Sequence, residues 1–242
     1  MSKSHYLGDG TIAEGIHISR GAVADTSHIN KFGYNTAVGS TYEPITDLGT
    51  NVLPTSAGVV SVVSADANDD DGDTGARTVE IQGLDANYVE QTETVTMNGT
   101  VAVSTTASFI RIFRMRVLSA GTSETNEGNI TASIGGSEVA RITAEEGQTL
   151  MAVYTVPDGK KAYLIKFQGS LSKNQEANFQ IRSRTVDNGW QTKGVFGVFS
   201  NTITYEYPIP LEFGAKNDIQ IRGKAGATSE MGAIFDLVLV ND

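Results

Sequence analysis

Short strand-like runs, separated by turns rich in glycine, recur from residue 58 to the C-terminus of the chain. Each run either alternates polar with apolar residues or is rich in β-branched ones, and both patterns are typical of strands. The predicted strands are 59–63, 78–84, 92–97, 101–106, 109–118, 150–156, 163–167, 179–184, 195–199, 203–207, 219–222 and 234–240. No stretch has a convincing amphipathic helical pattern. The sequence therefore predicts an all-β fold, an antiparallel β-sandwich of jelly-roll type.

Turn residues fix several of the connections between these runs. Asn98-Gly99 separates two alternating runs and is a strong signal for a two-residue hairpin. Gly135-Gly136 and Pro157-Asp158-Gly159 mark further turns. We therefore expect the runs 92–97 and 101–106 to pair with each other.

Residues 1–55 have a weaker pattern than the rest of the chain. The segment is rich in Gly, Ser, Thr and Asn, and its alternating isoleucines suggest at most one short strand: Ile12, Ile16 and Ile18. Pro44 and Pro54 interrupt its end. We interpret residues 1–55 as an extended, irregular N-terminal arm and residues 56–242 as the β-sandwich domain. An ordinary strand at the edge of a meander is the alternative.

The charge of the chain is negative and unevenly distributed. The 242 residues carry a formal net charge of −10. Residues 151–242 hold ten basic and nine acidic residues, so the whole excess of acid lies in residues 1–150. Nucleic-acid binders normally concentrate Lys and Arg, so we expect no nucleic-acid partner.

Composition also excludes several other classes. The chain has no cysteine, which excludes disulfide scaffolds, thiolate metal sites and cysteine nucleophiles. A membrane span needs about 18 consecutive apolar residues. The most apolar stretch, 234–240, is shorter and contains Asp236. Because residues 1–10 are polar, we also expect no secretory signal peptide.

An acidic loop follows the first predicted strand of the sandwich. Its polar residues are Asp66, Asn68, Asp69, Asp70, Asp71 and Asp73. Dense carboxylates are the ligands that Ca²⁺ prefers, but the EF-hand template fails: with Gly72 at its sixth position Ala67 falls at the first, and with Asp66 first Asp71 falls where glycine is required. We interpret the loop as a solvated, self-repelling segment and keep a cation site as the alternative.

Histidines occur only near the N-terminus, at His5, His17 and His28. Their spacings of 11 and 12 residues do not fit the four-residue spacing of a helical metal site. We therefore expect no metal ligand and no catalytic role for them.

Arg111 stands out within the predicted strand 109–118. Period two places it on the same face as Phe109, Phe113, Met115 and Val117. A buried guanidinium needs a carboxylate or several carbonyl groups. We favour an internal ion pair that holds the sandwich together over an interface clamp onto an acidic neighbour.

The single tryptophan, Trp190, follows a turn signal at Asp187-Asn188-Gly189. A tryptophan in such a place more often caps the edge of the core. The alternative is a loop-tip aromatic that stacks on sugars or anchors an interface.

No catalytic motif is present in the sequence. It contains no GxSxG, HExxH, P-loop or GxGxxG pattern. Carboxylates are abundant enough for a glycoside hydrolase, but no pair is singled out. We expect a protein that is not an enzyme, with no catalytic, cofactor-binding or metal-binding residues and no cofactor.

Several segments resemble a family of virion structural proteins from tailed bacteriophages, especially phages of aquatic bacteria. The resemblance spans roughly residues 60–170. The segments that carry it are Gly75-Ala76-Arg77-Thr78-Val79, Gly83-Leu84-Asp85, Glu93-Thr94-Val95-Thr96-Met97-Asn98-Gly99-Thr100, Phe109-Ile110-Arg111 and Met151-Ala152-Val153-Tyr154-Thr155-Val156-Pro157.

This resemblance implies a non-enzymatic component of the virion, assembled in the cytoplasm of a bacterial host. We expect a capsid decoration or cement protein on the outer head surface, with the major capsid protein and itself, as a homo-trimer or homo-dimer, as partners. No membrane partner is expected. The alternative is a tail or fibre-associated receptor-binding module, in which Trp190 and neighbouring loops contact glycans.

Overall fold

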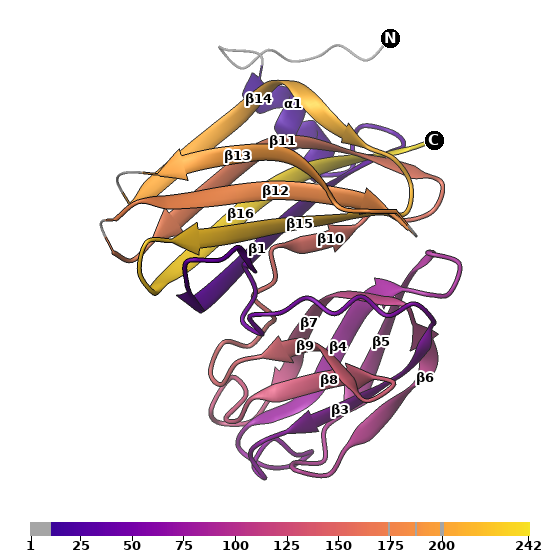
Figure 1. Cartoon of the computed structure of the whole chain (residues 1–242). Coiled ribbons are helices and arrows are strands. Elements are labelled where there is room, and N and C mark those ends of the chain that lie inside the picture. The colour runs from indigo at the N-terminus through magenta and orange to yellow at the C-terminus, as the bar shows by residue number, and fades with distance from the viewer. Residues whose placement is uncertain (1–10, 174, 187, 199–200) are drawn as a thin grey trace.

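The computed structural model describes residues 11–173, 175–186, 188–198 and 201–242, and the fold is all β, as the sequence predicts. Two antiparallel β-sandwich lobes make up the chain (Figure 1). We call them the terminal lobe, built from residues 26–44 and 153–241, and the central lobe, built from residues 58–142. In the described part of the chain, no helix is long and apolar enough to cross a membrane.

The terminal lobe combines strands from both ends of the chain. One sheet has the order β1-β16-β11-β14, and the other has the order β10-β15-β12-β13, with β2 added beside β15. The bounds of these strands are β1 Thr26–Val38, β2 Glu43–Pro44, β10 Val153–Thr155, β11 Lys160–Leu171, β12 Ala177–Thr185, β13 Gln191–Val198, β14 Thr202–Phe213, β15 Asn217–Ala225 and β16 Ser229–Asn241.

The central lobe lies between β2 and β10 in the chain. Its two sheets have the orders β6-β3-β8-β9 and β5-β4-β7. The bounds are β3 Gly58–Ser64, β4 Ala76–Leu84, β5 Glu90–Thr96, β6 Val103–Phe109, β7 Arg111–Ala120, β8 Ile130–Ile134 and β9 Ser137–Ile142. Sequence analysis did not predict β8 and β9, although it placed their turn correctly. Gly135 and Gly136 have φ of 58° and 81°, the left-handed region that this tight turn needs.

Residues 26–38 differ from the irregular arm that we expected over residues 1–55. They form β1, which pairs with β16 from Thr26↔Val240 to Val38↔Ser229. Polar residues at inward positions, among them the buried Lys31 and Asn35, hide the alternation of this strand in the sequence. The isoleucines at 12, 16 and 18 lie in a short helix, α1 Thr11–Ser19, and not in a strand. Ile12 and Ile16 are four residues apart, which is a helical spacing.

The hairpin predicted at Asn98-Gly99 is wrong in its pairing. A turn is present, with φ of 54° at Gly99, but β5 pairs with β4 while β6 pairs with β3. The chain therefore crosses from one sheet of the central lobe to the other at this turn. The acidic loop stabilises this turn, because the Gly99 amide donates a hydrogen bond to the Asp69 carbonyl at 2.8 Å.

The two lobes have separate hydrophobic cores that meet at one segment. Side chains of Met151 and Val153 pack in the central core, whereas Ala152, Tyr154 and Val156 pack in the terminal core. Successive side chains of an extended strand point to opposite sides. The segment around β10 thus contributes to both cores and ties the lobes together.

Candidate functional site

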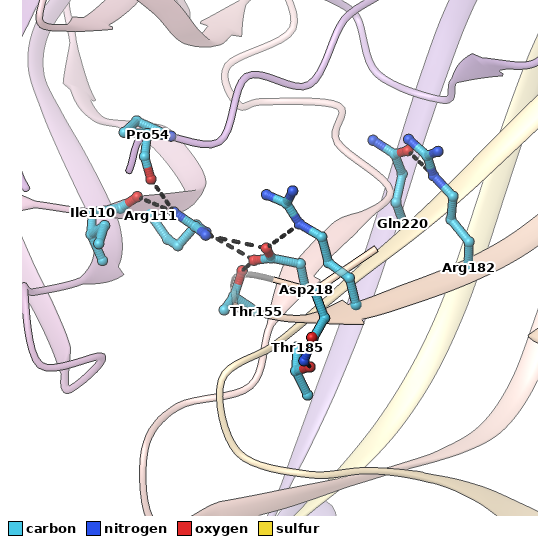
Figure 2. A network of polar contacts seen from close by, with 10 residues as sticks. Pro54, Ile110, Arg111, Thr155, Arg182, Thr185, Asp218 and Gln220 are labelled. Carbon is cyan, nitrogen blue, oxygen red and sulfur yellow. Dashed lines mark hydrogen bonds and ion pairs between the residues drawn. The ribbon is translucent and has the colours of Figure 1, made fainter. Parts of the chain in front are cut away.

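The junction between the lobes contains a buried ion pair (Figure 2). Arg111, at the start of β7 in the central lobe, donates from Nε to Asp218 Oδ1 on β15 at 2.8 Å and from Nη2 to Oδ2 at 3.1 Å. Both side chains are almost fully buried, at 5% and 2% exposure. Arg111 Nη1 donates to the backbone carbonyls of Pro54 and Ile110. The guanidinium is therefore well satisfied, as a buried charge must be.

Asp218 accepts from two further groups. Arg184 Nε on β12 donates to Oδ2 at 3.1 Å, and the Thr155 hydroxyl on β10 donates to Oδ1 at 2.7 Å. One carboxylate thus links β7, β10, β12 and β15. This confirms the internal ion pair that was predicted for Arg111. The pair joins the central lobe to the terminal lobe, and does not join the two sheets of a single sandwich.

A break in β7 explains why Arg111 leaves the central core. The register between β4 and β7 shifts between Gln82 and Gly83, so Arg111 lies opposite Leu84. At Gly83 an added Cβ would lie 2.1 Å from the Arg111 carbonyl oxygen, so only glycine allows this approach. The strand predicted as one run over 109–118 is divided between β6 and β7, and its period is interrupted before Arg111.

A second group of buried charges lies beside the junction. Lys31 of β1 donates from Nζ to the carbonyl of Phe113, and burial, together with the nearby Arg114, lowers the pKa of its ammonium well below the ordinary value. Asp47 lies nearby, and burial raises its pKa to about 7. One of its oxygens, Oδ1, is buried without a hydrogen-bond partner in the described part of the chain.

Cationic and aromatic side chains form a row on the outer face of β12 and the turn that follows it. The guanidinium carbons of Arg182 and Arg184 lie 4.1 and 4.9 Å from the centre of the Trp190 ring. Desolvation and the neighbouring arginines lower the pKa of Arg182 to about 10. Its Nε donates to Gln220 Oε1 on β15 at 2.7 Å (Figure 2).

The same row continues across β15 to β2. Arg222 and Lys224 lie 5.5 and 5.0 Å from the centre of the Tyr42 ring. Arg222 donates from Nη2 to the Tyr42 carbonyl, and its Nε is buried without a partner among the described residues. We call this set the cationic row: Tyr42, Arg182, Arg184, Trp190, Arg222 and Lys224.

Trp190 does not cap the core, contrary to the favoured sequence interpretation. In the described part of the chain it belongs to none of the hydrophobic clusters, and its ring packs on the two guanidiniums. It also borders a surface pocket of about 560 Å³ at the end of the terminal sandwich. The side chains around this pocket are mostly polar, among them Thr185, Asn188, Gln191 and Asn217.

The acidic loop is only partly the solvated segment that we expected. Asp71 and Asp73 are exposed, but Asp69 is completely buried. Its carboxylate accepts from the hydroxyl of Ser64 and from three backbone amides, those of Ala76, Glu127 and Gly128, at 2.5 to 2.9 Å. Asp69 is therefore an internal anchor for two loops of the central lobe.

The histidines are not brought together into a site that the structure describes. His5 lies outside the described residues, His17 lies in α1, and His28 on β1 contacts Asp236 at 3.0 Å. Over the described ranges, no three residues of the types His, Cys, Asp or Glu are grouped so that they could hold a metal ion.

Apolar side chains are exposed along the open edge of the terminal lobe. β14 and β13 are the last strands of their sheets. Ile209 on β14 is 85% exposed, Tyr205 is 41% exposed and Val195 on β13 is 54% exposed. Ile209 stands between Pro208 and Pro210, in a stretch where β14 bulges away from β11.

A second surface hollow lies on the outer face of the other sheet of the terminal lobe. This groove has a volume of about 590 Å³ and is mostly apolar, and its lining includes Phe32, Tyr34, Gly232 and Ile234. The Tyr34 hydroxyl donates to Glu230 Oε2 at 2.6 Å, and this bond is the main cause that raises the pKa of Tyr34 to about 12.

Sequence reasoning missed the partners that make these sites. Asp218, Arg182 and Arg222 were not singled out, although polar residues alternate with apolar ones through the runs 179–184 and 219–222. That alternation shows which side chains share the outer face of each strand. It does not show that the two strands are neighbours, and this pairing creates the cationic row.

No family model and no curated protein matches the chain. Among solved structures, a structure of the infectious bursal disease virus Gt strain is 11% identical, with 90% of this chain and 73% of that chain covered and a TM-score of 0.22. A structure of the Gx strain of the same virus is 9% identical, with 90% and 72% covered and a TM-score of 0.23. Such low scores establish neither a shared topology nor a shared function.

Proposed function

We propose that the chain is a non-enzymatic structural component of a virus particle, a decoration or cement protein that binds the outer surface of the major capsid shell. The resemblance to virion proteins of tailed phages supports this proposal. Its segments lie on β4, β5 and β10 and at the start of β7. They therefore include Arg111 and the strand that contributes to both cores, but not Asp218, so the resemblance covers one side of the junction between the lobes.

The observation that carries the proposal is the exposed apolar edge formed by β13 and β14. Ile209 is 85% exposed on a proline-flanked bulge, and Tyr205 and Val195 are exposed on the same two edge strands. Exposed apolar side chains that gather along one edge are more typical of an interaction surface than single ones. The two prolines lack amide donors, which hinders uncontrolled strand addition at this edge. Such an edge suits contact through side chains with another subunit. We propose that it joins copies of this chain into a homo-dimer or homo-trimer.

The oligomeric state in solution tests the proposed self-association through β13 and β14. Ile209→Asp places a charge in the proposed contact and should convert the oligomer to a monomer, measured by light scattering after gel filtration. Val101→Asp is the matched control, because Val101 is 58% exposed in the central lobe, outside this edge. A wild-type monomer at high concentration, or equal effects of both substitutions, would contradict self-association through β13 and β14.

We also propose that the segment before β1 is an arm that lies along neighbouring subunits in the particle. Within its described part, Ile16 and Val23 are 47% and 36% exposed. Burying them against a neighbour would add apolar contact area at each copy of a repeated interface. The presence of the chain in purified particles, in proportion to the major capsid protein, tests the virion assignment as a whole.

A further inference from the structure

The cationic row concentrates positive charge on a protein whose net charge is −10. Arg182 and Arg184 project from β12, and Arg222 and Lys224 from the adjacent β15. Within these two strands, both fully described, the only carboxylate is Asp218, which is already bonded to Arg111 and Arg184. Among the described residues, Glu43 on β2 also acts on Arg222, and Glu212 lines the pocket beside Arg184 and Trp190, together with Lys193. The row therefore holds more guanidinium charge than its own acids neutralise.

Aromatic rings hold these guanidiniums in place. Arg182 and Arg184 lie over the ring of Trp190, and Arg222 lies over the ring of Tyr42, at cation–π distances. A guanidinium that is already fixed loses little further conformational entropy when it binds an anion. Arg222 Nε, buried and without a partner among the described residues, and the desolvation of Arg182 indicate that this arrangement is costly without an anion. The row is thus preorganised for an anionic group.

The polar pocket beside Trp190 indicates what else the ligand carries. Arg184 and Trp190 belong to both the row and the pocket of about 560 Å³. Hydroxyl and amide side chains around the pocket supply donors and acceptors for hydroxyl groups. A planar carboxylate is the geometric match of a guanidinium. We propose that the cationic row and this pocket together bind an acidic saccharide, a sugar chain that carries carboxylates and hydroxyls.

Two other occupants fit less completely. An acidic protein segment offers carboxylates to the Arg, Trp and Tyr side chains that protein interfaces favour, but it lacks the many hydroxyl groups that suit the polar pocket. A nucleic acid has one charge for every phosphate, and the excess of acid over the rest of the chain repels such a dense polyanion. A short acidic oligosaccharide carries only a few charges in all and suits a small local cluster. This inference does not depend on the virion assignment.

Trp190 is the only tryptophan among the 242 residues, so the tryptophan fluorescence of the chain reports on this site alone. We would titrate the full chain with trigalacturonate and follow its tryptophan fluorescence, with maltotriose as the neutral control. We expect a saturable change with trigalacturonate that weakens as salt is added. Arg182→Gln and Arg222→Gln should each raise the dissociation constant at least tenfold. Arg141→Gln, which removes the same charge from the central lobe, should leave it unchanged.

Thermal unfolding of each variant shows whether it is folded, and equilibrium dialysis measures binding where a substitution alters the fluorescence itself. The proposal is overturned if trigalacturonate produces no saturable change, or if maltotriose binds equally well. It is also overturned if Arg182→Gln and Arg141→Gln bind alike. Binding of an oligoglutamate peptide without binding of trigalacturonate would assign the row to an acidic protein segment instead, and this outcome too would overturn the proposal.

Discussion

Arg111 of β7 and Asp218 of β15 are 107 positions apart in the chain, yet their side chains form a doubly hydrogen-bonded ion pair at the junction of the two lobes. Removing one partner from such a pair leaves an uncompensated buried charge. The pair therefore acts as a constraint on how the lobes are joined. Around it, β10 contributes alternate side chains to both cores.

Disruption of this pair should destabilise the chain strongly. We expect Arg111→Met to lower the free energy of unfolding by about 3–5 kcal/mol, measured by denaturant unfolding. Asp218→Asn should cost more, because two guanidiniums share this carboxylate. Arg141→Met is the control, since its pair with Glu138 is partly exposed and should contribute about 1 kcal/mol or less. Similar losses for Arg111→Met and Arg141→Met would show that the buried junction pair contributes no more to the free energy of unfolding than the partly exposed pair.

Asp69 should be the essential residue of the acidic loop. In Asp69→Asn an amide group replaces a carboxylate oxygen and faces backbone amide donors, so we expect a loss of about 2–3 kcal/mol. Asp71→Asn removes the same charge from an exposed position and should change stability by about 0.5 kcal/mol or less. Chemical denaturation of both variants measures this difference, and equal stability of the two would refute the anchoring role.

Asp47 should make stability depend on pH. Its folded pKa is raised to about 7 from an ordinary value of 3.8, so the native state favours the protonated acid. The stabilisation is fully present below about pH 4 and is lost as the pH rises through 7. Asp47→Asn should therefore be more stable than the wild type at pH 8, by up to about 4 kcal/mol, because each pKa unit corresponds to about 1.4 kcal/mol. This advantage should disappear near pH 4, and a pH-independent difference between the two proteins would be inconsistent with the raised pKa.

Limited proteolysis with trypsin should detect the boundary between the proposed arm and the terminal lobe. Arg20 is exposed between α1 and β1, whereas Lys31 is buried in paired β1. Brief digestion should cut after Arg20 and not after Lys31, as judged by mass spectrometry, and loss of the segment before residue 21 should leave the unfolding transition unchanged, as judged by circular dichroism. Cleavage after Lys31 at a similar rate would mean that β1 is not a stable part of the sheet.

The sequence predicts the fold class because period two and turn residues are local properties. Gly135-Gly136 shows this, since two left-handed glycines specify a tight turn wherever they occur. Pairing is not local: Asn98-Gly99 turns the chain, but β5 and β6 join different sheets. A buried ion pair is predictable from Arg111 on an apolar face, although its partner is not. Asp218 becomes a candidate only when β15 is known to lie against the central lobe.

The copy number of the chain in purified particles of its virus tests the central claim most directly. Quantitative mass spectrometry against the major capsid protein gives this ratio. A decoration protein repeats with the lattice of the shell, so the account predicts a fixed ratio to the capsid subunits and hundreds of copies per particle. A few to about 20 copies, the small multiples set by the symmetry of a tail, would contradict a position on the head. Absence from purified particles would contradict the structural role itself.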